Sequence, residues 1–163
     1  MANWAAKGPG MSWDHPLVLR GHTWWRTERF EGAWEVPPFL EVNASKGPVL
    51  LDFQRATILT PVIDIVINAT WLGAVTLIVP EGWGVDTEGV KVDNGQTAGL
   101  NSSVRTRPER GMPRLILRGN FAGSVVVRHP RWADRRALTK WERLGRPAPA
   151  LALPPGPVGS GHV

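Results

Sequence analysis

The sequence contains no cysteine, no tyrosine and no long apolar run. Without cysteine the chain can form neither a disulfide nor a thiolate nucleophile, and zinc or iron–sulfur sites that need a Cys ligand are excluded. The longest mainly apolar stretch, Trp71 to Pro80, is far shorter than the ~20 residues of a membrane-spanning helix, and residues 1–10 lack the apolar core of a signal peptide. We therefore expect a cytoplasmic protein, attached to membranes at most peripherally.

The composition is that of a folded chain. Of its 163 residues, 42% are hydrophobic and 20% are charged, which suits a single domain with a real core. Glycine and proline are abundant, at 18 and 15 residues. This many turn-forming residues favours short strands over a helical bundle. The formal net charge of +5 permits an anionic partner but does not identify one.

A repeat runs through the middle of the chain. The hexamer Leu17–His22 (LVLRGH) returns almost unchanged as Leu115–Asn120 (LILRGN). Aligning the two copies brings intermediate segments into line and gives apolar anchors spaced 23, 25, 25 and 25 residues apart. These ladder residues are Leu19, Val42, Ile67, Val92 and Leu117.

Glycines recur with nearly the same period, at Gly47, Gly73, Gly99 and Gly123. A valine follows two residues later in every copy but the third, which has Asn101. We interpret these glycines as corners, where a positive φ or a close backbone approach excludes a Cβ. The polar segment 95–103 of the third copy is expected to be an exposed loop, with a lateral contact site as the alternative.

A fixed period in the low twenties, built from short β-rich runs, is typical of a solenoid in which each repeat forms one coil. We predict an all-β, single-chain β-solenoid (β-helix) of about five coils over residues 17–130, with the ladder residues stacked inward ~4.8 Å apart. An antiparallel sandwich or barrel is the alternative, but it does not require anchors at this period. The clearest strands are Pro48–Phe53, Val62–Ile67, Ala74–Val79 and Ser124–Arg128.

Basic residues concentrate after the repeat. Residues 131–146 contain six basic and two acidic residues, a local balance of +4. Apolar residues recur there at helical spacing, and Gly145 and Pro147 end the pattern. We predict a basic amphipathic helix over 131–145 that caps the last coil, the alternative being contact with an anionic membrane surface. The candidate partner or membrane contacts are Trp132, Arg135, Arg136, Lys140, Trp141 and Arg143.

The two ends of the chain are expected to lie outside the domain. We predict a flexible leader over residues 1–16. Residues 146–163 are rich in Pro, Ala and Gly and poor in large apolar groups, so we expect a disordered tail.

Three stretches resemble a known family. They are Phe30–Pro37 (FEGAWEVP), Leu77–Trp83 (LIVPEGW) and Pro113–Gly119 (PRLILRG), the last followed by Gly123–Val125 (GSV). Over roughly residues 25–130 the chain is similar to the C-terminal domain of the LiaF-like proteins, the cell-wall-active antibiotic response family, with similar domains in many actinobacterial proteins. The resemblance implies a right-handed solenoid akin to that of bactofilins and a bacterial envelope-stress role exerted through protein contacts, without chemistry.

The sequence lacks recognisable catalytic motifs. It has no His-Glu-x-x-His, no Gly-x-Ser-x-Gly, no phosphate loop and no complete dinucleotide fingerprint, and its four histidines are scattered. Asp52 and Asp64 are the candidates for acid–base work, if they face one another across neighbouring coils as in sugar-cleaving solenoids. Outward carboxylates on half-exposed strands explain both more simply. We therefore predict no enzymatic activity, cofactor or metal.

Aromatic and basic residues also cluster near the start of the repeat. Trp24, Trp25, Arg26 and Arg29 combine stacking surfaces with positive charge, as single-strand binders do, but covering an open solenoid end is the favoured interpretation. Nucleic acid is therefore an unlikely partner. Our leading hypothesis is a domain that binds a protein partner, followed by a self-assembling filament protein and then by a carbohydrate-binding or hydrolytic solenoid.

Overall fold

The computed structural model describes residues 9–70, 73–92 and 99–145, and these form two five-stranded sheets, one two-stranded sheet and one helix. The first sheet has the spatial order β1 (Leu17–Arg20), β4 (Phe39–Asn43), β7 (Val62–Asn68), β11 (Arg114–Phe121), β9 (Gly84–Val92). The second has the order β10 (Leu100–Ser102), β12 (Ser124–Arg128), β8 (Ala74–Ile78), β5 (Val49–Asp52), β2 (Glu28–Phe30). β3 (Glu35–Val36) pairs with β6 (Thr57–Ile58), and α1 spans Trp132–Arg143.

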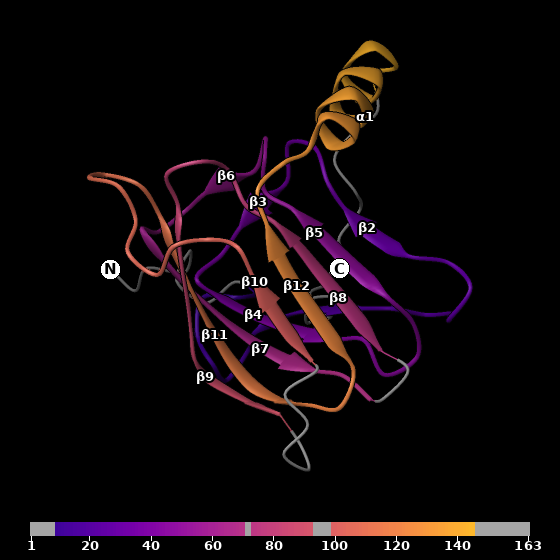
Figure 1. Cartoon of the computed structure of the whole chain (residues 1–163), viewed down its shortest axis with the longest axis vertical. Helices are drawn as coiled ribbons and strands as arrows, with labels where there is room; N and C mark the ends of the chain where they lie inside the picture. The colour runs from indigo at the N-terminus through magenta and orange to yellow at the C-terminus, as the bar shows by residue number, and fades with distance from the viewer. Residues whose placement is uncertain (1–8, 71–72, 93–98, 146–163) are drawn as a thin grey trace, which may run out of the picture.

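All strand pairings within these sheets are parallel. The chain passes alternately through the first and the second sheet, so that it forms five successive strand pairs: β1/β2, β4/β5, β7/β8, β9/β10 and β11/β12. Inner residues of both sheets pack into one core, and Figure 1 shows α1 beyond the end of β12. The prediction of a mostly β chain with one C-terminal helix is confirmed, and the four clearest predicted strands are present as β5, β7, β8 and β12.

The strand pairs do not stack in the order of the sequence. In both sheets the fifth pair, β11/β12, lies between the third and the fourth. β9 and β10 are therefore edge strands, although they lie in the middle of the repeat. β10, which falls within the segment expected to be a loop, is short and largely exposed, while residues 93–98 of that segment lie outside the described residues.

The predicted ladder is correct over three anchors and wrong over two. Leu19 pairs with Val42 and Val42 with Ile67, and all three side chains are buried. Leu117 instead pairs with Ile65, and Val92 pairs with Phe121 of β11. For Leu117 the physical reason is the two-residue period of a strand, because a shift of two residues keeps the same side chains on the inner face. Val92 is displaced by four residues, and the register between β9 and β11 is irregular. The hexamer likeness could not reveal such a shift.

The glycine column is confirmed as a line of close backbone approaches. A Cβ on Gly47 would lie 2.1 Å from the Thr23 carbonyl oxygen, and one on Gly123 would lie 2.1 Å from that of Gly73. A Cβ on Gly99 would lie 2.9 Å from the Gly123 oxygen, so the column follows the spatial order of the strand pairs. None of the four predicted corner glycines, Gly47, Gly73, Gly99 and Gly123, has a positive φ, so close approach alone is the reason for glycine.

The exceptional third copy is explained by a slip of one residue. Val49 pairs with Val75 and Val75 with Val125, two residues after their glycines, whereas Leu100 pairs with Val125 directly after Gly99. Asn101 is exposed and does not occupy the inner position.

Aromatic residues form a second column inside the molecule. Ring centroids of Trp34 and Phe53 lie 5.4 Å apart, and those of Phe53 and Trp83 lie 5.7 Å apart. The Trp34 indole N–H donates to the Asp52 carbonyl oxygen at 2.9 Å, which satisfies the polar atom of a fully buried ring. These rings join the first three strand pairs where the chain leaves the second sheet.

The predicted leader needs correction, whereas the predicted tail is not tested. Part of the expected leader is packed, since the Trp13 ring lies 5.0 Å from that of Phe39 and the Phe39 N–H donates to the Gly10 oxygen. Residues 1–8 and the expected tail, 146–163, lie outside the described residues.

The predicted helix exists but does not cap the last coil. It has no buried residue, and it reaches back across the second sheet, where the Trp141 ring lies against Gly32 next to the first strand pair. Its two acidic side chains bind Arg128 and Arg55 near the carboxyl ends of β12 and β5, and this attachment directs the helix along the strand ends.

Replacing Ile67 by Asp should unfold the domain, because it would bury an unpaired carboxylate in the apolar core next to Val42. Val66→Asp is the matched control, since this neighbouring side chain is only half-buried. We expect loss of the cooperative thermal transition for the first variant and its retention for the second. Similar stability of the two variants would contradict the assignment of the inner face.

Replacing Gly123 by Ala tests the glycine column, since the new methyl group would overlap the Gly73 carbonyl and force the backbones apart. We expect a loss of about 3 kcal/mol or more in the free energy of unfolding, as for severe overpacking. Gly111→Ala meets no atom within 4 Å and pays only for its positive φ, about 1 to 2 kcal/mol. Urea unfolding of both variants measures the difference, and equal losses would argue against the column.

Candidate functional site

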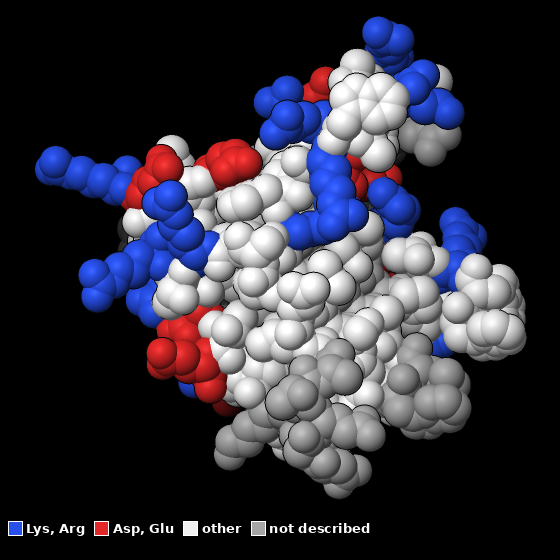
Figure 2. Space-filling model, in the orientation of Figure 1, with Lys and Arg blue, Asp and Glu red and all other residues white. Residues whose placement is uncertain are grey.

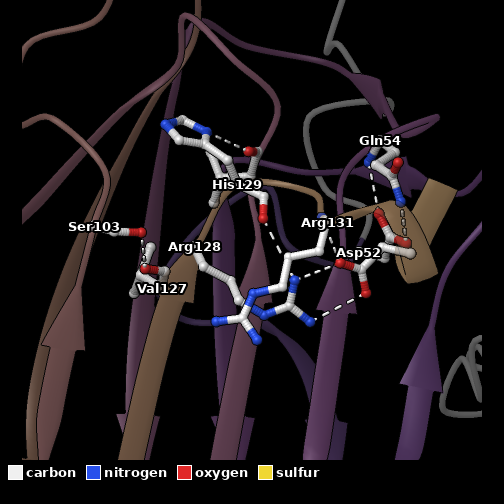
Figure 3. Close-up of polar contacts among 9 residues, drawn as sticks. Asp52, Gln54, Ser103, Val127, Arg128, His129 and Arg131 are labelled. Atoms are coloured by element: carbon white, nitrogen blue, oxygen red, sulfur yellow. Dashed lines mark hydrogen bonds and ion pairs between the residues drawn. The ribbon is translucent and has the colours of Figure 1, made fainter.

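Polar residues gather where the carboxyl ends of the second-sheet strands meet α1. Asp52, Ile78 and Arg128 occupy equivalent register positions on β5, β8 and β12. All three side chains point away from the inner core, yet Asp52 is only 4% exposed and Ile78 is fully buried. This end of the outer face is therefore covered, and Figure 3 shows its polar contacts.

Asp52 is held by its own turn. Its carboxylate accepts hydrogen bonds from the Gln54 backbone N–H at 2.9 Å and from the Gln54 side-chain amide at 2.8 Å. Burial raises the pKa of Asp52 above its ordinary value, and the two Gln54 bonds offset only part of this effect. The Asp52 carboxyl group therefore has a structural role at the end of β5.

Arg128 and Asp134 lock α1 to the end of β12. Arg128 donates to both oxygens of the Asp134 carboxylate, one of these bonds measuring 3.1 Å, and the Arg131 backbone N–H donates to the same group at 2.7 Å. Burial alone would raise the pKa of Asp134, but the bonds from Arg128 and Arg131 outweigh it and lower the pKa. The same pairing raises the pKa of Arg128.

The histidines that the structure describes are not grouped for metal binding. The His129 Nδ1 atom lies 2.9 Å from the Val79 oxygen, and its Nε2 lies 3.8 Å from the Glu81 carboxylate, so this ring joins the ends of β12 and β8. In the described part of the chain no three His, Asp or Glu residues are placed to hold a metal ion. His162 lies outside that part.

Asp52 and Asp64 do not face one another. Asp52 belongs to the second sheet, whereas Asp64 lies on β7 of the first sheet, where it forms an ion pair of 3.3 Å with Arg118 of β11. A neighbouring pair on that face joins Asp86 and Arg114 at 2.7 Å. The paired-carboxylate hypothesis fails because strands close in sequence belong to different sheets.

The candidate partner or membrane contacts of α1 fall into two groups. The Trp132 side chain is 71% exposed, and the Arg136 guanidinium lies 5.1 Å from the centre of its ring. Trp141 instead packs toward Gly32 and is half-buried. Figure 2 shows Lys and Arg side chains gathered at the end of the molecule where α1 lies. The exposed basic contacts are Arg135, Arg136, Lys140 and Arg143.

Trp24 and Trp25 are the other prominent surface group. Each is 73% exposed, and their rings meet edge to face with centroids 5.7 Å apart. They lie in the connection between β1 and β2, and Trp24 lines a depression together with His22, Ser45 and Lys46. Both rings are largely exposed, and their predicted role in covering a solenoid end stays a prediction.

The sequence could not reveal the site at the strand ends. The alternation of the strand predicts an outward, half-exposed Asp52, whereas the folded protein buries it. One sequence signal for the start of α1 was available, namely Asp134 at the third helical position. Its side chain accepts a hydrogen bond from the backbone N–H of Arg131.

Comparisons with known protein families, curated proteins and solved structures found no match to this chain. Within the residues that the structure describes, no helix is long and apolar enough to cross a bilayer.

Replacing Asp52 by Asn should stabilise the protein at neutral pH. Because the raised pKa means that the folded state holds this proton more tightly than the unfolded chain, the wild type loses stability as pH rises through that pKa. We expect the advantage of Asp52→Asn to be largest at pH 7 and to vanish below the ordinary value of 3.8.

Chemical unfolding across this pH range measures the effect of Asp52→Asn. Asp14→Asn removes the same charge from an exposed position and serves as the control. A less stable Asp52→Asn variant at pH 7 would mean that the carboxylate itself holds the strand end together.

Proposed function

We propose that the chain is a right-handed β-solenoid that works as a non-enzymatic protein-interaction domain. The single observation that carries the proposal is the exposed pair Trp24 and Trp25 beside the free edge of both sheets. Exposed tryptophans in contact with one another are typical of binding hot spots. In an isolated domain they leave a large apolar surface in water.

The solenoid part of the proposal rests on the strand pairing. Each pass through the first sheet is followed by a pass through the second, and all the pairings are parallel. Parallel crossover connections are right-handed in nearly all known cases. The glycine column adds support, since it joins equivalent corners of successive passes.

The edge beside the tryptophans supports a protein partner in particular. β1 and β2 are terminal strands of their sheets, so each has one side without a neighbouring strand among the described residues. An extended peptide can add to such an edge through main-chain hydrogen bonds while aromatic side chains provide specificity. We propose that the partner binds in this way, with Trp24 and Trp25 as anchors.

The physiological setting follows from the family resemblance. The segments Phe30–Pro37, Leu77–Trp83 and Pro113–Gly119 are similar to LiaF-like sequences, and on this ground we propose a role in regulating the bacterial cell-envelope stress response. Kinship with that family remains part of the proposal.

Site-specific crosslinking tests the proposed surface. Because the chain has no cysteine, a single Arg26→Cys substitution can carry a photo-crosslinker next to the tryptophans. Glu109→Cys, an exposed position on the β10–β11 connection, is the control. We expect a discrete adduct with one protein from extracts of the native cells at the first position only. An envelope protein in the adduct would support the regulatory role, and no adduct would contradict the proposed surface.

Replacing both Trp24 and Trp25 by Ser should abolish this adduct by removing the anchors. Since both rings are exposed, we expect the free energy of unfolding to change by no more than about 0.5 kcal/mol. Crosslinking yield and thermal unfolding measure the two effects. An undiminished yield would show that the tryptophans are not part of the interface.

Self-assembly is the second candidate function. The end opposite β1/β2 also has free edges, on β9 and β10, so copies could stack head to tail into filaments. Sedimentation at rising protein concentration distinguishes this from partner binding, because filaments grow with concentration whereas a monomer or dimer keeps its size.

A further inference from the structure

The charges of α1 are divided between its two faces. The helix carries two acidic residues, and both are bound to the body of the protein: Asp134 pairs with Arg128, and Glu142 pairs with Arg55 at 2.9 Å. The half-buried side chains Leu138 and Trp141 lie on the same side of the helix as these two acids. The inward face therefore contains all the negative charge of the helix.

The opposite face is cationic. Residues 132, 136, 140 and 143 follow one another at helical spacing, and 135 and 139 flank them. Within the residues that the structure describes, the basic side chains of this face form no ion pair. The sequence that follows, 146–163, contains no Asp or Glu that could neutralise them. The outward cations are Arg135, Arg136, Lys140 and Arg143.

The helix is held in one orientation. Its first turn is attached through Asp134 to Arg128 and to the Arg131 backbone, and its last turns are attached through Trp141 to Gly32 and through Glu142 to Arg55. These contacts lie on one side and at both ends, so the cationic face points away from the sheets. A fixed cationic face without acidic neighbours attracts anionic ligands.

We propose that this face of α1 docks on an anionic lipid membrane. Trp132 favours lipid over other polyanions, because an exposed indole beside arginines suits the boundary between headgroups and acyl chains. Arg136, Lys140 and Arg143 share one side of the helix and can contact lipid phosphates together, while Arg135 lies at the border of that side. The site is distinct from the Trp24–Trp25 surface, and the proposal does not depend on the proposed protein partner.

Vesicle co-sedimentation of the full chain tests the docking. We expect binding to vesicles made from a two-to-one mixture of phosphatidylcholine and phosphatidylglycerol, weaker binding as salt is raised, and no binding to phosphatidylcholine alone. Arg135→Glu/Arg136→Glu should weaken binding by at least about 30-fold, since each basic residue near an anionic surface contributes about fivefold in affinity. Trp132→Ser should weaken vesicle binding relative to the wild type most clearly at high salt, where the charges are screened.

Arg105→Glu/Arg107→Glu is the matched control. Both arginines are exposed, and the variant changes the net charge by the same amount at positions outside α1. We expect it to bind the mixed vesicles within about threefold of the wild type, because an outlying charge contributes little to a local contact. Circular dichroism and thermal unfolding establish that both variants are folded, as glutamate is a good helix former.

Three outcomes would overturn the proposal. One is equal weakening by the two charge-reversal pairs, which would indicate attraction by net charge alone. Another is binding to single-stranded DNA or RNA, measured by fluorescence anisotropy, that depends on Arg135 and Arg136 while the mixed vesicles are not bound. The third is the absence of vesicle binding by the folded wild type at low salt.

Discussion

Parallel pairing between successive passes of the chain is the constraint on which the rest of the structure depends. It brings equivalent residues of neighbouring strand pairs within about 5 Å of one another, so each side chain must fit against its equivalents on the adjacent strands. At the corners the approach is closer still, and a Cβ on Gly21, Gly47 or Gly123 would overlap a neighbouring carbonyl. The apolar inner face, the aromatic rings of Trp34 and Phe53 and the glycine corners all follow from this one spacing.

The sequence predicts which side chains are buried more reliably than which strands are neighbours. The repeat correctly placed Leu19, Val42 and Ile67 in one row, because inner positions need apolar residues at every pass. It could not place β11/β12 between the third and fourth strand pairs. All copies of a repeat have similar sequences, and this similarity does not determine the order in which the strand pairs stack. The available clue was polarity: Ser124–Arg128 has three consecutive valines and lies between two neighbours, whereas Leu100–Ser102 is polar and forms an edge.

The helix shows the same limit at its attachment. Helical periodicity and the stop at Gly145 gave its bounds within a residue or two, because these depend on local residues alone. Its position depends on two ion pairs. Arg128 and Asp134 are 6 residues apart in the chain, and Arg55 and Glu142 are 87 residues apart. Counting the charge of the segment gave a balance of +4 but not its division between faces. That division arises only when the sheets bind both acids.

The two proposed surfaces lie at opposite ends of the same strands. The connection carrying Trp24 and Trp25 enters β2 at its amino end, while α1 lies at the carboxyl ends and touches Gly32 just beyond β2. β2 is three residues long, which corresponds to about 10 Å. A protein bound to the tryptophans would therefore be held within a few tens of ångströms of a surface bound to α1. Because both contacts are made by one rigid sheet and its attached helix, occupation of one need not block the other, and the domain is suited to presenting a partner at a membrane.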